Sequence, residues 1–262
     1  MNVTESRFKN RQLHIEDYLQ MVSAEQKEYA EVFDYSKITE KSGVITDYWT
    51  NNLLDLILRK DNLNNAYKQV KKNKGKGGID GMQVDELLPF LRENQDTLIR
   101  KIREGKYKPN PVRRVEIPKE TEGEFRKLGV PTVVDRVIQQ AIAQELSPVY
   151  EKQFSENSFG FRPKRGAHDA LRQCQKNVND GYVYVVDMDL EKFFDTVCQS
   201  KLIEVLSRTI KDGRVISLIH KYLNAGVIAK GMFERTEVGM PQGGPLSPLL
   251  SNVMLNELDK EL

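Results

Sequence analysis

The chain has 262 residues, of which 39% are hydrophobic and 30% are charged, and its formal net charge is +2. This composition is typical of a soluble globular protein with a sizeable core in one or two domains. No apolar run reaches the roughly 18 residues that a membrane-spanning helix needs. The N-terminus lacks the apolar core of a secretory signal. Cys174 and Cys198 have no C-x-x-C partner, which argues against structural zinc or a disulfide framework and indicates a reducing cytoplasm.

Predicted helices occur along most of the chain after a polar stretch at residues 1–50. Apolar residues recur at spacings of three and four in segments 53–57, 63–70, 85–103, 135–146, 169–178, 201–210 and 215–223. An alternating stretch at 112–119, a turn and a returning stretch at 126–132 predict a β-hairpin. Strong helices that precede a late set of strands favour an α+β fold over a doubly wound sheet.

A basic, glycine-rich stretch follows the second predicted helix. It contains Lys71, Lys72, Lys74 and Lys76 and ends at Gly81. No Gly-Lys-Ser/Thr occurs at the spacing of a nucleotide-binding P-loop. Two interpretations are equally open: a solvated, flexible loop, or a surface that follows nucleic-acid phosphates.

A β-branched and aromatic segment that ends in acids is the first informative motif. Its alternation predicts a strand with Asp187 and Asp189 on one face. Carboxylates at a strand end can hold hard cations such as Mg²⁺, which phosphoryl transfer uses. An isolated Asp-x-Asp is more often a strand with solvated acids at its end. The adjoining Phe193, Phe194 and Asp195 shift the balance towards a metal site.

The second motif is the segment Gly-Met-Pro-Gln-Gly-Gly-Pro-Leu-Ser-Pro at residues 239–248. Its glycines allow the backbone to approach a ligand closely, and Gln242 offers donors and an acceptor. Prolines suit the first turn of a helix. An apolar stripe then predicts that this helix docks on a core through Leu250, Met254, Leu258 and Leu262.

Five ordered blocks carry a family resemblance. They are Gly78–Gly81, Arg126–Ile142, Phe154–Pro163 with Ala167–Ala170, the acidic strand, and the Pro-Gln-Gly-Gly loop. From about Leu53 onwards, the chain resembles the reverse transcriptase of a bacterial group II intron, the intron-encoded maturase.

The resemblance implies a right-hand polymerase of the α+β class. We expect an N-terminal extension at 1–50, helix-rich fingers with a β-hairpin at 51–178, and part of an antiparallel palm sheet at 179–262. A third palm motif with two aspartates, a thumb and a maturase domain follow in this family. We therefore interpret the 262 residues as a fragment that is inactive on its own.

The resemblance also assigns site residues. Asp189 matches the catalytic, metal-binding aspartate, the carbonyl of Leu190 a further ligand, and Asp187 a supporting carboxylate, with two Mg²⁺ ions in the complete enzyme. The residues implied to bind the incoming nucleotide are Lys119 and Arg126 at the triphosphate, Phe194 or less favourably Phe193 at the sugar, and Gln242 and Gly243 at the base pair.

Basic side chains complete the expected interface with RNA. They are Lys71, Lys72, Lys74, Lys76, Arg113, Arg114, Arg162, Lys164 and Arg165. His168, at a helix start, is interpreted as structural or template-facing rather than catalytic. The expected partners are group II intron RNA, an RNA template with a DNA primer, and deoxynucleoside triphosphates, in a bacterial cytoplasm. A homodimer is compatible with the sequence, which does not decide the oligomeric state.

Two other functions compete with this interpretation. One is a retron, diversity-generating or CRISPR-associated reverse transcriptase. The other is an RNA-binding splicing cofactor that keeps the fold without polymerising. The Gln-Gln-Ala-Ile and Phe-Ser-Glu-Asn-Ser-Phe-Gly-Phe-Arg-Pro blocks favour the intron type.

Overall fold

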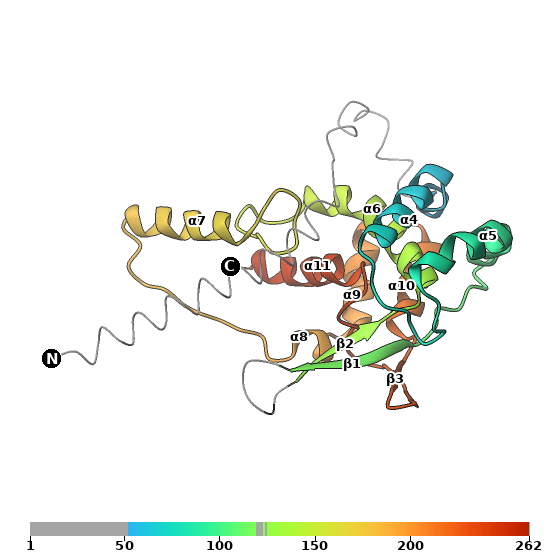
Figure 1. Ribbon diagram of the computed structural model, residues 1–262. Helices are drawn as coiled ribbons and strands as arrows, with labels where there is room; N and C mark the ends of the chain where they lie inside the picture. The colour runs from blue at the N-terminus through green and yellow to red at the C-terminus, as the bar shows by residue number, and fades with distance from the viewer. Residues whose placement is uncertain (1–51, 119–122, 124, 262) are drawn as a thin grey trace. The chain divides into compact units, whose positions relative to one another are not determined.

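The computed structural model of the protein describes residues 52–118, 123 and 125–261 (Figure 1). The chain divides into two compact units, and the smaller of them includes residues 154–188. The larger unit contains the residues described before and after that segment. The polar stretch at 1–50, Lys119 and Leu262 lie outside the described residues.

Helix α6 (Val133–Glu151) lies at the centre of the larger unit. Its buried side chains include Ile138, Ile142 and Leu146, which confirms the helix predicted at 135–146. The hydroxyl of Thr132 caps the helix by accepting a hydrogen bond from the backbone N–H of Asp135. The helices packed around α6 are α3 (Leu53–Ile57), α4 (Lys60–Lys72) and α11 (Ser247–Asp259).

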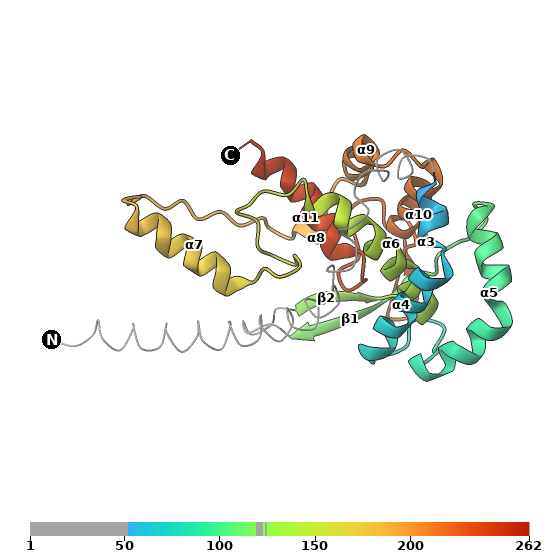
Figure 2. The ribbon, with the colours of Figure 1, turned by 90° about the horizontal axis from the view of Figure 1, so that it is seen from above.

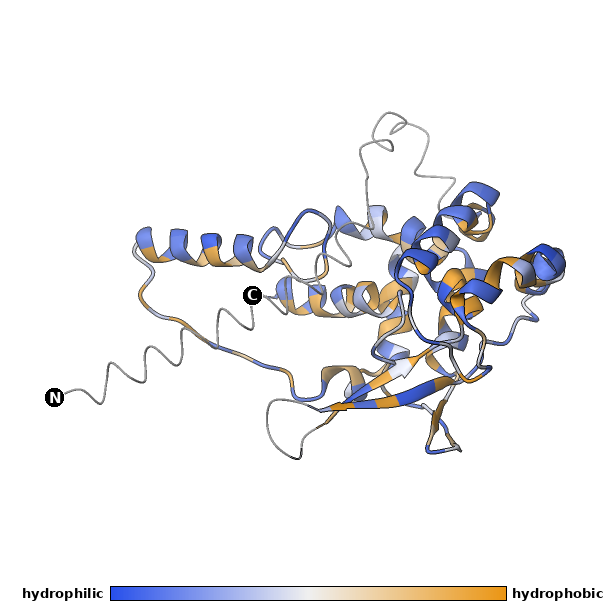
Figure 3. Ribbon diagram, in the orientation of Figure 1, coloured by the Kyte–Doolittle hydropathy of each residue, from blue (hydrophilic) through white to orange (hydrophobic). Residues whose placement is uncertain are grey.

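A four-stranded mixed sheet has the strand order β2-β1-β3-β4. Its strands are β1 (Val112–Pro118), β2 (Phe125–Val130), β3 (Val227–Ala229) and β4 (Met232–Glu234). The predicted hairpin is confirmed, because β1 and β2 pair antiparallel, whereas β1 and β3 pair in parallel. Figure 3 shows the polar and apolar bands that alternate along β1.

Three further helices of the larger unit agree with the apolar spacing of the sequence. They are α5 (Leu87–Arg103), which follows a short 3₁₀ turn, η3 (Val84–Glu86), together with α9 (Gln199–Thr209) and α10 (Gly213–Leu223). The short helix α8 (Phe193–Thr196) was not predicted. Helix α9 packs on both α10 and α11, as the two views in Figures 1 and 2 show. In α11 the predicted stripe is only partly buried: Leu250 is in the core, but Leu258 is exposed.

The described part of the smaller unit consists of an irregular loop, helix α7 (Ala167–Asn179) and a following segment. The backbone N–H of Gly166, before the first turn of α7, donates to the carboxylate of Asp169 over 2.9 Å. This bond satisfies one N–H at the start of the helix and fixes where the helix begins.

The acidic segment is not a strand in this structure. Residues 183–190 pair with no other described segment, and their side chains are exposed, with Tyr184 at 94%. The strand predicted from their alternation is therefore not observed, because a strand forms only where a neighbour pairs with its N–H and C=O groups. The α+β class is confirmed, although the observed sheet is mixed and is built on the 112–130 hairpin.

No helix within the described ranges is long and apolar enough to cross a membrane.

Candidate nucleotide-binding site

The two sequence motifs meet in the larger unit. The backbone N–H of Met240 donates to the carbonyl of Phe194 over 2.7 Å, and that of Gly239 donates to Val197 over 2.8 Å. Gly239 has a φ of +82°, and a Cβ atom there would lie 2.8 Å from the Phe194 carbonyl oxygen. A side chain at this position would therefore separate the glycine loop from α8.

The hairpin contacts the same loop from another side. The N–H of Gly129 in β2 donates to the carbonyl of Gln242 over 2.7 Å. Gly243 has a φ of +119°, and a Cβ atom there would lie 2.9 Å from the carbonyl oxygen of Gly129. The glycine motif thus allows close backbone packing between the loop and β2.

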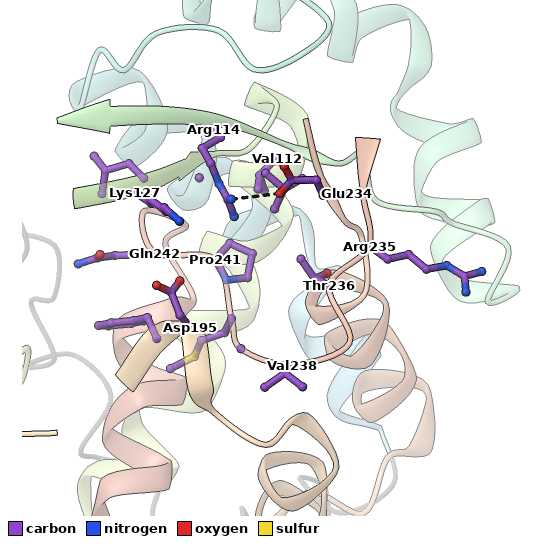
Figure 4. Close-up of a pocket in the computed structure, with 16 residues that line it drawn as sticks. Val112, Arg114, Lys127, Asp195, Glu234, Arg235, Thr236, Val238, Pro241 and Gln242 are labelled. Atoms are coloured by element: carbon purple, nitrogen blue, oxygen red, sulfur yellow. Dashed lines mark hydrogen bonds and ion pairs between the residues drawn. The ribbon is translucent and has the colours of Figure 1, made fainter. Parts of the chain in front are cut away.

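These contacts enclose a cavity of about 280 Å³ (Figure 4). Its lining includes Lys127 from β2, Phe194 and Asp195 from α8, and Gln242 from the glycine loop. In Figure 4, Lys127, Asp195 and Gln242 lie on one side of the cavity. A cation, an aromatic ring and an amide are suitable groups for binding a phosphorylated nucleoside.

An ion pair between two residues of the cavity lining links β1 to β4, the strands on either side of β3. Nη1 of Arg114 in β1 lies 3.1 Å from Oε2 of Glu234 in β4 (Figure 4). Glu234 is about half exposed, so the pair adds little stability. Arg114, expected to contact RNA, is therefore engaged with a carboxylate that lines the cavity.

The two phenylalanines differ in position although both are half-buried. Their rings pack edge to face, with centroids 5.6 Å apart and planes at 79°. Only Phe194 contributes to the cavity lining, which favours it over Phe193 as the residue beside a bound sugar. Arg126 is exposed on β2 opposite Ile117, and it is not among the lining residues.

The candidate metal ligands are all on the surface. Asp187, Asp189 and Leu190 are exposed, and Asp187 and Asp189 fall on opposite sides of the division between the two units. Among the residues that the structure describes, no group of three or more His, Cys, Asp or Glu residues could hold a metal ion. The structure therefore does not bring the predicted carboxylates together with a third ligand.

The basic loop is hydrogen-bonded to neighbouring elements through its backbone. Lys71 and Lys72 belong to the last turn of α4, and Lys74 and Lys76 are exposed beyond it. A guanidinium N–H of Arg113 donates to the carbonyl of Gly77 over 2.9 Å. The loop therefore presents its lysines from a backbone that is anchored to β1.

Helix α6 provides a second anchor for this loop. The guanidinium of Arg136 donates to the carbonyl of Lys76. Burial lowers the pKa of Arg136, and the nearby Asp80 carboxylate opposes this effect. Arg113 and Arg136 thus both donate to the backbone of this loop, and the predicted contact of Arg113 with RNA stays a prediction.

Arg162 and Arg165 organise the loop before α7. Arg162 is only 4% exposed and donates to the carbonyls of Ser155 and Ser158, so it is not available to a template phosphate in this conformation. Arg165 donates to the carboxylate of Glu156 over 2.7 Å. Lys164 and His168 are exposed. Lys164 is thus the most accessible of the three predicted RNA-binding cations Arg162, Lys164 and Arg165.

Several functional positions had no signal in the sequence. Lys127 and Glu234 line the cavity because of strand register, and Arg136 anchors the basic loop from a helix. Asp195, noted in the sequence beside the two phenylalanines, also lines the cavity. Glu234 reaches the cavity because β3, which pairs with β4, also pairs with β1 from a distant segment of the chain.

Comparison with known proteins assigns the chain to a family. The family model described as reverse transcriptase (RNA-dependent DNA polymerase) matches residues 117–262. The chain belongs to the reverse transcriptase family. The match includes the hairpin from Ile117, helix α6 and both motifs at the cavity.

Relatives whose names refer to introns align with most of the chain. It is 36% identical over 224 residues to the group II intron-encoded protein LtrA of Lactococcus lactis subsp. cremoris, with 86% of this chain and 37% of LtrA aligned. It is 35% identical over 237 residues to the putative COX1/OXI3 intron 2 protein of Saccharomyces cerevisiae, with 87% of the chain and 27% of that protein aligned.

Two further comparisons bear on length and fold. Protein YkfC of Escherichia coli K12 is 38% identical over 216 residues, or 80% of the chain and 56% of YkfC. The chain therefore spans less than two thirds of the relatives it matches. A solved partial Cas6-RT-Cas1--Cas2 complex aligns with a TM-score of 0.55 and 25% identity, over 80% of this chain and 35% of the other.

Proposed function

We propose that the whole protein is an RNA-directed DNA polymerase of the group II intron type, which binds intron RNA for splicing and retrohoming and copies RNA into DNA. The single observation that carries the proposal is that Phe194 and Gln242, one from each sequence motif, line one cavity. The motifs are joined there by the 2.7 Å hydrogen bond from the N–H of Met240 to the carbonyl of Phe194. The names of the Lactococcus and yeast relatives support the intron type. We also propose a bacterial cytoplasmic setting.

In this proposal the cavity holds the sugar and base of an incoming deoxynucleoside triphosphate. Phe194 contacts the sugar where a ribose would carry its 2′-hydroxyl, while Gln242 and Gly243 contact the base pair. Lys119 and Arg126, from the two arms of the hairpin, bind the triphosphate through charge-assisted hydrogen bonds. The cavity of about 280 Å³ is near the lower limit for small-molecule sites, about 300 Å³.

Mg²⁺ is the proposed cofactor. The carboxylate of Asp189 and the carbonyl of Leu190 are hard oxygen donors of the kind that Mg²⁺ prefers, with Asp187 as a supporting carboxylate. These residues fit the chemistry of the ion but supply only part of a two-ion site. When bound, the ions would activate the primer 3′-hydroxyl and neutralise the leaving pyrophosphate.

The basic loop is proposed to bind RNA. Arg113 and Arg136 hold its backbone, so its exposed lysines are presented without a large ordering cost on binding. Phosphate contacts from such lysines provide affinity for structured intron RNA without reading sequence.

A second candidate function comes from the structural comparison. The solved Cas6-RT-Cas1--Cas2 complex contains a reverse transcriptase with this fold, which favours a CRISPR-associated role as the alternative. Intron RNA separates the two proposals: an intron-type protein binds its own intron far more tightly than an unrelated structured RNA of equal length. Equal affinity for both RNAs would favour the alternative.

Primer extension on an RNA template with the whole protein tests the polymerase proposal. Asp189→Asn keeps the size of the side chain and removes the charge that holds the metal, so cDNA synthesis should be abolished while RNA binding stays within a few-fold. Asp187→Asn removes the supporting carboxylate and should therefore lose less activity than Asp189→Asn. Inactivity of Asp187→Asn with an active Asp189→Asn would refute the ligand assignment. RNA binding by a wild-type protein that never extends a primer would instead indicate a non-catalytic splicing cofactor.

A further inference from the structure

A buried glutamine contacts the glycine loop from behind. Gln199 is the first residue of α9 and is only 5% exposed. Its Nε2 donates to the carbonyls of Gly239 over 2.8 Å, Leu223 over 3.2 Å and Thr236 over 3.3 Å. One side-chain amide thus joins the end of α10, the segment after β4 and the start of the glycine loop.

The carbonyl of Gly239 needs a buried donor. Gly239 is itself buried, and the amide of Gln199 donates to its carbonyl. A buried carbonyl without a hydrogen bond is costly. Gln199 therefore satisfies the carbonyl of Gly239, while the carbonyls of Val197 and Phe194 accept from the N–H groups of Gly239 and Met240.

The hydroxyl of Thr236 reinforces the same junction. It donates to the carbonyl of Leu223 over 2.8 Å and accepts from the N–H of Gly226 over 3.3 Å. Gln199, unlike Thr236, also bonds to Gly239, so its side chain links the carbonyl of Thr236 to that of Gly239. Loss of its amide would release the loop at Gly239, three residues before Gln242.

We propose that Gln199 is a positioning residue for the nucleotide-binding site. Its amide holds the peptide at Gly239 against α8 and thereby fixes the place of Gln242 in the cavity. The proposal rests on the proposed function only in taking Gln242 as a contact of the nucleotide.

Hydrogen exchange on the 262-residue chain tests the structural part without any activity. Gln199→Met keeps the length of the side chain but removes the donor. Amides in residues 236–243 should then exchange about tenfold faster, as expected for loss of roughly one net hydrogen bond. Gln140→Met is the matched control, because Gln140 is equally buried on α6 and does not line the cavity.

The outcomes of the exchange experiment are distinct. Faster exchange confined to residues 236–243 in Gln199→Met and absent from Gln140→Met supports the proposal. Unchanged exchange in that segment, or the same increase along the whole chain in both variants, would overturn it. A whole protein without polymerase activity would refute the proposed function and leave this result standing.

Kinetics of the whole protein test the link to the nucleotide. Gln199→Met should raise the apparent KM for the deoxynucleotide by about fivefold while kcat changes less, because binding rather than chemistry loses a contact. Gln199→Asn, which keeps the amide on a shorter side chain, should restore only part of the affinity. An equal fall in kcat for Gln199→Met and Gln140→Met, with KM unchanged, would reduce Gln199 to a general role in stability.

Discussion

A Cβ atom added to Gly239 would lie 2.8 Å from the carbonyl oxygen of Phe194. The glycine loop and α8 are therefore joined at a distance that no other residue type allows. The hydrogen bond from Met240 to the same carbonyl depends on this approach. Stability and the shape of the cavity are thus coupled at one position.

The Gly239→Ala substitution should destabilise the fold by about 2 kcal/mol or more, because it adds a steric clash to the strain of a positive φ. Gly105→Ala has a positive φ of +66° but no atom within 4 Å, so it should show the strain alone. Gly213→Ala has neither problem and should be nearly neutral. Chemical denaturation of the three variants measures the loss of stability in each. Equal losses of stability in Gly239→Ala and Gly105→Ala would show that the loop moves to relieve the clash at little cost.

Acid should weaken the junction between α3 and α10 through Asp212. Burial raises the pKa of this carboxyl. Hydrogen bonds from the Arg214 side chain and the Leu54 N–H together lower it by more than burial raises it, so the pKa lies below its usual 3.8. A carboxyl whose pKa is lowered by folding stabilises the folded state fully at pH values above its unfolded pKa. This stability is lost as the pH falls from the unfolded pKa through the folded pKa.

The Asp212→Asn variant tests this sign. It should be about 2 kcal/mol less stable at neutral pH, because bonds to a charged acceptor are lost. It should also lose less stability than the wild type below pH 3.8. Urea denaturation across pH provides the measurement. Asp96→Asn is the control, because Asp96 is an exposed residue of α5. Parallel pH profiles for wild type and Asp212→Asn would contradict the assignment.

Sugar selection should depend on Phe194 and much less on Phe193. Phe194→Ala removes the ring that lines the cavity and should let the whole protein incorporate ribonucleotides. Phe193→Ala removes the neighbouring ring, which does not line it. Single-nucleotide incorporation with paired ribo- and deoxynucleotides measures the ratio. Loss of selectivity only in Phe193→Ala would assign the sugar contact to the other ring.

The lysines of the basic loop should account for most of the salt dependence of RNA binding. Alanine at Lys71, Lys72, Lys74 and Lys76 should reduce the log–log slope by up to ~3 units if each lysine contacts a phosphate. Filter binding across a salt series measures the slope. Four other exposed lysines serve as a charge-matched control, and their removal should change the slope less: Lys101, Lys201, Lys211 and Lys260. The same slope change in both variants would show a general charge effect.

Local patterns in the sequence predicted much of the fold. The helices around Ile138 and Val215 and the hairpin at 112–130 follow from apolar spacing and alternation, which operate over a few residues. The strand at 183–190 was predicted from the same kind of pattern and is unpaired here. Pairing depends on a neighbour, and alternation carries no information about whether that neighbour is present.

The candidate site was predicted less completely. Phe194 and Gln242 were identified from motifs, and the structure joins them at one cavity. The contacts that hold this arrangement were not identified, because Gln199 and Arg136 act through backbone carbonyls far away in the sequence. A side chain that bonds to backbone leaves no residue-type pattern at its partner.

The parallel pairing of Val112 with Val227 has a consequence for synthesis. During translation the β1–β2 hairpin emerges well before β3, so the edge of β1 that later accepts β3 stays open while the intervening chain is made. Closing this long-range contact is slow compared with forming the hairpin or the helices. The cavity lies beside that junction and therefore assembles late, and an exposed sheet edge makes the nascent chain prone to aggregation until β3 arrives.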